Sequence, residues 1–129
     1  MMQGVFHAKA LDTDVFLVTL KKSEADYSPT TMYRDYAISP DIFHWESQSQ
    51  TSVASPTGQR YVRQGERGNE ILIFVREQKV WEFGKGVPYT LLGPADYVSH
   101  RGERPIELVW RLRHPMPADM FHVARAAAS

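Results

Sequence analysis

The sequence predicts a mainly β fold with minor α: a twisted antiparallel sheet that closes into a small partial barrel, with a short C-terminal helix. Three observations support this prediction: five or more short runs rich in β-branched and aromatic residues, prolines and glycines at the ends of these runs, and little helical periodicity. The chain has 129 residues, of which 43% are hydrophobic and 23% charged. We therefore expect one β-rich domain over residues 1–129, with its core within residues 5–121.

The N-terminal half contributes two predicted strands. Residues 15–20 read VFLVTL, a run typical of a buried strand, and residues 42–48 form the second candidate. The polar segment 23–31 between them predicts an ordered loop. Residues 48–58 are rich in Ser, Thr and Gln and predict an exposed loop that ends at Gly58.

The middle of the chain predicts a β-hairpin with a polar tip. Residues 59–62 and 71–76 would be its two strands, because both are short runs that contain β-branched or aromatic residues. Gly65 and Gly68 would supply the backbone conformations of the connection. The arginines of these two strands would then lie close together.

The C-terminal part predicts two more strands and a helix. Residues 89–92 and 106–112 are the strands, and the second of them largely alternates apolar and polar residues. Turns are expected at residues 93–94, which are Gly-Pro, and at residues 101–103. Pro115 and Pro117 then end the strand, because proline cannot donate a backbone hydrogen bond to a neighbouring strand. Residues 118–128 predict a terminal helix.

Composition excludes several classes of protein. The chain has no cysteine, so disulfides, thiolate nucleophiles and zinc ribbons are excluded, and it has no apolar run of about 20 residues that would predict a membrane span. We expect a cytoplasmic protein with no membrane partner. Fifteen basic and fifteen acidic residues cancel, but eight arginines lie within residues 60–113, which predicts a local positive face.

No motif of an enzyme or a metal site is present. The five histidines show no HxH or HExxH spacing, and neither a GxSxG elbow nor a GxxxxGK[ST] phosphate loop occurs. His100 could act as a general base only beside a nucleophile or a held water, and its neighbours specify neither. We therefore expect no catalytic activity, no cofactor and no metal.

Four groups of side chains suit nucleic-acid binding. Residues 27–36 combine hydroxyls with tyrosines, residues 43–50 place aromatic rings before two amides, and residues 97–101 combine a ring, a hydroxyl, an imidazole and a guanidinium. Arg60 and Arg76 could jointly clamp a phosphate from the two hairpin strands. The candidate nucleic-acid-binding residues are Lys22, Tyr27, Ser28, Tyr33, Trp45, Gln48, Ser49, Gln50, Arg60, Tyr61, Arg76, Tyr97, His100 and Arg101.

Each group also has a purely structural interpretation. The tyrosines of residues 27–36 could pack over the sheet, and Phe43 and Trp45 could belong to the core, which would leave only the loop amides for function. The arginines could form internal ion pairs with nearby carboxylates. The residues alone leave these alternatives open.

Several long and unusual stretches of the chain match a known family. They are VFLVTLKKSEADYSPTTMYRDYAIS from Val15, FHWESQS from Phe43, SPTGQRY from Ser55, LIFVRE from Leu72 and LLGPADYVSHRGERPIELVW from Leu91. They resemble the uncharacterised C-terminal domain of bacterial superfamily II helicases of the DEAD/DEAH type, often found with a phospholipase-D-like nuclease domain. That family ordinarily has FHWQSQS, whereas this chain has Glu46 in place of the first amide.

The resemblance implies a DNA-binding accessory module that works beside a helicase in restriction or phage defence and reads a modified base or backbone. It covers only the accessory domain, so it implies neither ATP hydrolysis nor strand cleavage. The expected partner is DNA, which could be single-stranded, duplex or modified. The alternative function is a protein-interaction domain that docks onto a helicase or nuclease partner, and the neutral net charge suits this alternative. Salt dependence of binding would distinguish the two.

Overall fold

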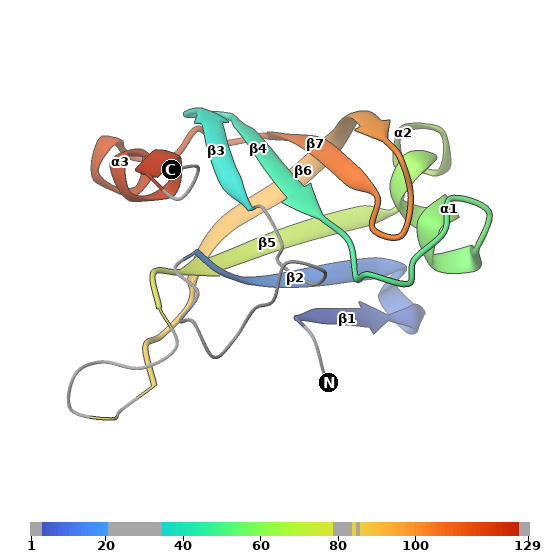
Figure 1. Cartoon of the computed structure of the whole chain (residues 1–129), viewed down its shortest axis with the longest axis horizontal. Coiled ribbons are helices and arrows are strands. Elements are labelled where there is room, and N and C mark those ends of the chain that lie inside the picture. The colour runs from blue at the N-terminus through green and yellow to red at the C-terminus, as the bar shows by residue number, and fades with distance from the viewer. Residues whose placement is uncertain (1–3, 21–34, 79–83, 85, 127–129) are drawn as a thin grey trace.

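A seven-stranded mixed β-sheet forms the body of the protein (Figure 1). The structure is a computed structural model, and it describes residues 4–20, 35–78, 84 and 86–126. The elements of these residues are β1 (Val5–Ala8), a 3-10 turn (Lys9–Leu11), β2 (Thr13–Thr19), β3 (Tyr36–Ser39), β4 (Ile42–Glu46), α1 (Pro56–Val62), α2 (Gln64–Arg67), β5 (Glu70–Arg76), β6 (Thr90–Arg101), β7 (Glu107–Leu112) and α3 (Ala118–Ala126).

The observed strand order confirms one part of the predicted architecture and contradicts another. The order is β1-β2-β5-β6-β7-β4-β3, and every neighbouring pair is antiparallel except β2 and β5, which are parallel. The predicted mainly β fold is confirmed, but the prediction of an entirely antiparallel sheet is wrong. β2 and β5 are both nearly continuous apolar runs, as is typical of parallel strands. The sheet is not closed, because its order ends at β1 and β3.

The long strand β6 joins the two halves of the sheet. Its first residues pair with β5 and its later residues pair with β7. The predicted turn at Gly93 and Pro94 is wrong, because both residues lie inside β6 and pair with β5. Gly93 has a φ of +105°, and the ladder shifts register opposite it between Ile73 and Phe74. This bulge bends the strand instead of reversing it.

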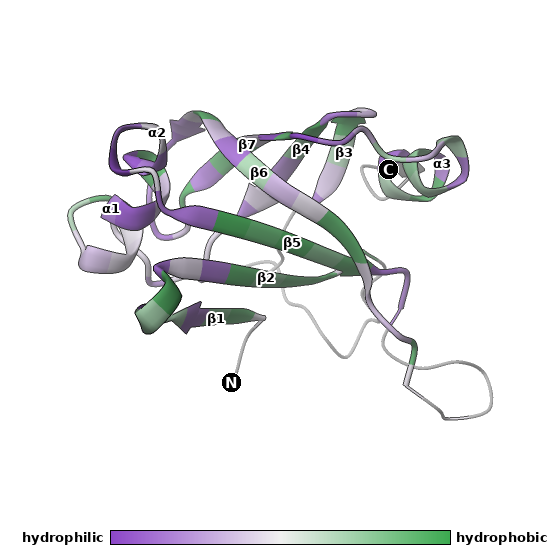
Figure 2. Cartoon of the chain, turned by 180° about the vertical axis from the view of Figure 1, so that it is seen from behind, coloured by the Kyte–Doolittle hydropathy of each residue, from purple (hydrophilic) through white to green (hydrophobic). Residues whose placement is uncertain are grey.

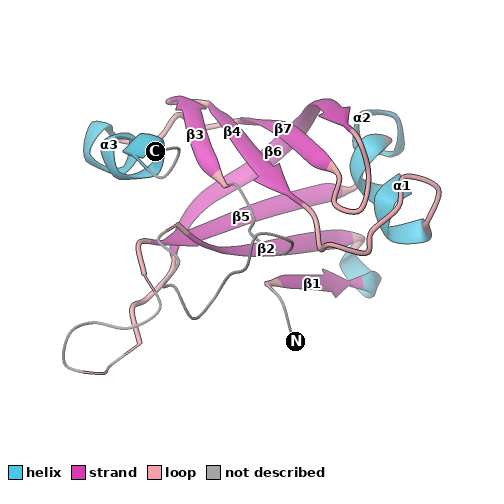
Figure 3. Ribbon diagram, in the orientation of Figure 1, coloured by secondary structure: helices cyan, strands magenta, loops and turns pink. Residues whose placement is uncertain are grey.

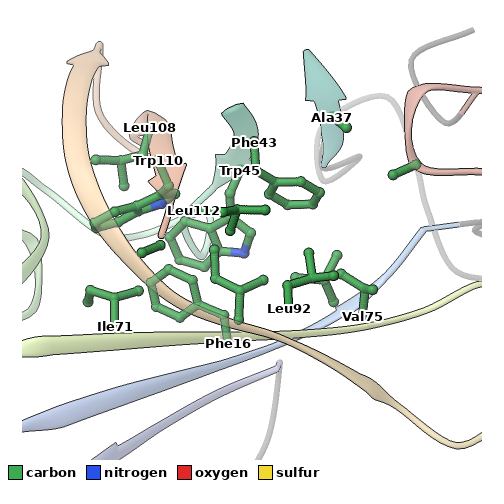
Figure 4. Close-up of a cluster of buried hydrophobic side chains, with 14 of the residues drawn as sticks. Phe16, Ala37, Phe43, Trp45, Ile71, Val75, Leu92, Leu108, Trp110 and Leu112 are labelled. Carbon is green, nitrogen blue, oxygen red and sulfur yellow. The ribbon is translucent and has the colours of Figure 1, made fainter. Parts of the chain in front are cut away.

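The two halves of the sheet enclose one aromatic core. Figure 4 shows Phe16, Ile71 and Val75 on one side of this core, facing Trp45 and Trp110 on the other. The Phe16 and Trp45 rings stack with centroids 3.9 Å apart, and Trp110 meets Phe16 edge-on at 5.6 Å. Offset and edge-on aromatic pairs stabilise a core beyond their buried area.

The helices lie at the two ends of the strands, α1 and α2 at one end and α3 at the other (Figure 3). The predicted hairpin is wrong in its first strand, because residues 59–62 belong to α1. The Ser55 hydroxyl caps this helix by accepting from the Gly58 amide at 3.0 Å, and Pro56 occupies the first helical turn. No helix of the described residues has the length and apolarity to cross a bilayer.

The exposed loop predicted over residues 48–58 is too long, because its last three residues belong to α1 and Gly58 is buried. The remaining predicted elements agree with the structure within a few residues. Predicted strands 15–20, 42–48, 71–76, 89–92 and 106–112 correspond to β2, β4, β5, the start of β6, and β7. The terminal helix is confirmed as α3. The predicted loop at residues 23–31 lies outside the described residues.

Gly58 is required by a close approach of two backbone segments. A Cβ atom at this position would lie 2.1 Å from the Ser52 carbonyl oxygen and 2.9 Å from that of Val53. In an open helix Gly→Ala stabilises by up to about 1 kcal/mol. We expect Gly58→Ala instead to lower the free energy of unfolding by about 1–3 kcal/mol, because the backbone at Ser52 and Val53 must move to make room for the added methyl group. Urea unfolding measures the change, and Gly65→Ala, which meets no atom within 4 Å, is the control. A gain in stability for Gly58→Ala would contradict this close approach.

Candidate nucleic-acid interface

A shallow groove of about 260 Å³ opens on the outward face of the half-sheet formed by β3, β4, β7 and β6. Strand alternation places its side chains there, because Phe43 and Trp45 of β4 point into the core while His44 between them points outward. The groove is lined by Tyr36, His44, Ser99, His100, Arg101, Glu107 and Val109. These residues come from all four strands of the half-sheet or from their ends.

The floor of the groove is a stacked pair of rings. Tyr36 and His44 are cross-strand neighbours, and their rings lie 4.6 Å apart with an interplanar angle of 14°. His44 is buried, and its Nε2 atom lies 3.3 Å from Oε1 of Glu107. Because His44 is covered and held from two sides, Tyr36 provides the accessible ring of the pair.

An arginine and a glutamate form the wall of the groove on β6 and β7. Arg101 pairs in register with Glu107, and its guanidinium donates to both carboxylate oxygens at 3.0–3.2 Å. The Arg101 side chain remains 81% exposed. The Arg101 guanidinium lowers the pKa of the Glu107 carboxyl, and the His44 contact lowers it further. The groove therefore presents both a cation and a carboxylate acceptor to a ligand.

His100, which lines the groove, contacts the ring of Tyr97, which packs against the core. The Tyr97 hydroxyl lies 2.7 Å from Nδ1 of His100, and the Tyr97 ring meets Trp110 edge-on at 6.4 Å. Partial burial raises the pKa of the Tyr97 hydroxyl. The Tyr97 ring thus packs against Trp110 in the core, while its hydroxyl contacts the exposed imidazole of His100.

The predicted amide loop follows β4 at the end of the groove that carries Arg101 and Glu107. The Ser47 hydroxyl accepts from the Ile106 amide at 2.8 Å, and the Thr51 carbonyl accepts from the Arg104 amide at 2.9 Å. These bonds join the loop after β4 to the hairpin between β6 and β7. Gln48, Ser49 and Gln50, which the sequence analysis selected, therefore lie at the same end of the half-sheet as Tyr97, His100 and Arg101.

Acid should weaken the ion pair of the groove. A carboxyl group whose pKa is lower in the folded chain stabilises the fold above its unfolded pKa, about 4.3, and this stabilisation is lost as the pH falls through the folded pKa. We expect Glu107→Gln to lose less stability in acid than the wild type, by up to about 1 kcal/mol because the group is near the surface. Thermal melting at neutral pH and below about pH 4 measures the difference. Equal acid sensitivity of the two proteins would contradict it.

Two predicted aromatic contacts belong to the core instead. Trp45 is 4% exposed and stacks on Phe16, and Tyr61 is 1% exposed and meets both of these rings edge-on. Burial raises the pKa of the Tyr61 hydroxyl. The structural interpretation therefore holds for Trp45, and Tyr61, which was selected only as a binding residue, is also a core residue that is not accessible to a base.

The predicted phosphate clamp is not formed. Arg60 lies on α1 and donates to both oxygens of the buried Asp14 at 2.9 and 3.1 Å. Arg76 lies at the far end of β5, where it donates to the Thr19 hydroxyl at 3.0 Å and covers the Tyr89 ring. Asp14 pairs with Ile71, so the two arginines are separated by about 17 Å along β5 at roughly 3.3 Å per residue.

A model of one protein family matches residues 1–124, and its description is "Domain of unknown function (DUF3427)". The chain belongs to this family. A search of curated proteins found no match to it.

The groove of this DUF3427 domain includes residues that the sequence analysis missed. Tyr36, His44 and Glu107 were not selected, because they come together only through the pairing of β3, β4 and β7. The alternation in residues 106–112 could have identified Glu107 as outward-facing. The selected residues Lys22, Tyr27, Ser28 and Tyr33 lie outside the described residues.

Proposed function

We propose that this DUF3427 domain binds DNA through the groove on β3, β4, β7 and β6. The observation that carries the proposal is the convergence of an accessible ring at Tyr36, a guanidinium at Arg101 and hydrogen-bonding groups at Ser99 and His100. Open sheet faces with aromatic rings bind unstacked bases, while arginines beside them contact phosphate or base edges.

The size of the groove favours a single nucleotide. At about 260 Å³ it is slightly smaller than pockets for drug-sized ligands, which begin near 300 Å³. A base lying on Tyr36 would meet the Arg101 guanidinium and the Glu107 carboxylate at its edge, and the exposed Gln50 lies in the adjacent loop. This arrangement supports reading of an unpaired or modified base rather than of a long duplex.

The resemblance to helicase-associated domains supplies the context of the proposal. A module that holds unpaired nucleotides is useful beside a motor that separates strands, and a defence system needs to distinguish modified from unmodified DNA. The neutral net charge predicts few phosphate contacts and hence a shallow salt dependence.

Fluorescence-anisotropy titration against single-stranded, duplex and modified DNA at two salt concentrations tests the proposal. We expect Arg101→Gln to weaken binding and to lower the slope of log K against log salt by about 1. The matched control is Arg63→Gln, because Arg63 is also exposed and paired with one glutamate, at 3.0 Å, but lies between α1 and α2. Absence of binding, or equal losses in both variants, would contradict the groove as the site.

The alternative function, docking onto a helicase or nuclease partner, is favoured by the zero net charge. A docking contact would lose almost no affinity as salt rises, whereas each phosphate contact in the groove adds about 1 to the slope of log K against log salt, so even a few contacts give a measurable slope. The same titrations, repeated with a candidate partner in place of DNA, therefore distinguish the two functions.

A further inference from the structure

The half of the sheet opposite the groove has an apolar outward face. Figure 2 shows β1, β2 and β5 side by side, with hydrophobic residues along much of β2 and β5. Phe6 and Leu91 are 52% and 53% exposed, and the other four side chains are half-buried. The residues of this apolar face are Phe6, Val15, Leu17, Leu72, Phe74 and Leu91.

The strand registers make these side chains one continuous surface. Val15 lies between Phe6 and Leu72 on the neighbouring strands, and Phe74 lies between Leu17 and Leu91. Alternation along β2 and β5 separates all of them from the buried Phe16, Ile71, Ile73 and Val75, which face the core.

No helix of the described residues packs on the apolar face. α1 and α2 pack against β6 and against each other, and α3 packs against β3. Strands whose apolar runs are nearly continuous are normally covered on both faces, especially where they pair in parallel, as β2 and β5 do. A contiguous apolar patch that joins two exposed side chains, Phe6 and Leu91, through partly exposed ones marks an interaction site.

We propose that the apolar face binds a second copy of this chain, with a two-fold axis between the two sheets that runs perpendicular to the strands and crosses β5 at Ile73. Such an axis makes the facing strands antiparallel and sets β5 over β5 and β2 over β2. Phe16 pairs with Ile73, so the axis crosses both strands at their centres. Two sheets pack face to face in this manner about 10 Å apart.

The residues of the face are complementary to themselves under this axis. Leu72 of one copy lies over Phe74 of the other, and Val15 lies over Leu17, so apolar groups meet throughout. Glu70 and Arg76 occupy the two ends of β5, so each carboxylate lies at the end that carries the guanidinium of the other copy. Within its own chain Glu70 has a loose contact with Arg113 at 3.5 Å, and Arg76 donates to the Thr19 hydroxyl, so the intermolecular contact is added to existing ones for both groups. An axis that runs along β5 would instead place Glu70 over Glu70 and Arg76 over Arg76, which is unfavourable. Charge complementarity thus favours the perpendicular axis over an axis along β5.

The size of the face predicts a reversible dimer. Six apolar side chains are far fewer than the roughly 20–30 residues that each partner contributes to a standard stable interface. We therefore expect association at micromolar rather than nanomolar concentrations. The dimer leaves both grooves accessible on its two outer sides, so it does not depend on the proposed DNA binding.

Sedimentation velocity over a concentration series tests the proposal. The wild type should shift from monomer to dimer as its concentration rises, and Leu72→Lys or Phe74→Glu should each abolish the dimer, because an unpaired charge would be buried. Ile38→Lys is the control, since Ile38 is also exposed and apolar but lies on β3. Circular dichroism and thermal melting confirm that the variants fold.

Mixing the two variants tests the two-fold arrangement itself. Under the proposed axis residue 72 of one copy lies over residue 74 of the other, so a Leu72→Lys chain and a Phe74→Glu chain would form a heterodimer with one lysine–glutamate pair and one Leu72–Phe74 contact. We expect the mixture to dimerise although neither variant does so alone. A mixture that stays monomeric, a wild type that is monomeric at all concentrations, or a Leu72→Lys variant that still dimerises would each overturn the proposal.

Discussion

Arg60→Met is expected to destabilise the protein by about 3–5 kcal/mol, because it leaves a buried carboxylate without its partner. Asp14 lies in β2 with an exposed fraction of 0%, and Arg60 of α1 donates two hydrogen bonds to it. His7 of β1 lies 3.3 Å from the same carboxylate. The pair therefore connects α1 to the sheet, and its loss affects an element that the sequence did not predict.

Urea unfolding of three variants separates this effect from loss of charge in general. Arg63→Ala removes an exposed pair with Glu66 and should cost about 0–1 kcal/mol. The double variant Asp14→Val with Arg60→Met removes both charges and should recover most of the loss, because a buried ion pair replaced by apolar groups is often nearly neutral. A double variant as unstable as Arg60→Met alone would show that Asp14 is not the cause.

Phe16→Ala is the second large effect, with an expected loss of about 3–5 kcal/mol. Phe16 is fully buried at the centre of the aromatic core, where it stacks on Trp45 and meets Tyr61 and Trp110 edge-on. Removal of this ring leaves a cavity between the rings of Trp45, Tyr61 and Trp110, and a densely packed interior relaxes only partly around such a cavity.

Urea unfolding monitored by tryptophan fluorescence measures the loss of stability in Phe16→Ala, because Trp45 and Trp110 both contact the Phe16 ring. Leu11→Ala is the control, since Leu11 is an exposed large hydrophobic residue and should change stability by no more than about 0.5 kcal/mol. A loss below about 1 kcal/mol for Phe16→Ala would mean that the core is less tightly packed than the structure describes.

The strands with the strongest local pattern were predictable from the sequence, and the helices of the middle segment were not. β2, β5 and β7 are runs in which β-branched and apolar residues dominate, so local preference and tertiary burial agree. Residues 59–62 contain Tyr61 and Val62, which favour a strand, yet they form α1 because Ser55 caps it and Tyr61 is anchored in the core. Tertiary packing overrides weak preference there.

The candidate site was predictable only in its local parts. Residues 48–50 and 97–101 are adjacent in sequence to a strand end, so their polar and aromatic character identified them. The contact between His44 and Glu107 joins positions 63 residues apart, and no local pattern specifies it. The arginine clamp failed for the same reason, since it relied on a strand pairing that does not exist.

We expect the parallel pairing of β2 with β5 to slow folding. β1 and β2 form a local hairpin, but β2 gains its second neighbour only when residue 70 and those after it have emerged, long after Thr19. The chain between β2 and β5 loses conformational entropy when it closes into a loop, and this loss comes before the contacts between the two strands form. Folding to the native topology is therefore slowed. During synthesis the VFLVTL segment therefore stays unprotected, and we expect this segment to be the part of the nascent chain most prone to aggregation and most in need of a chaperone.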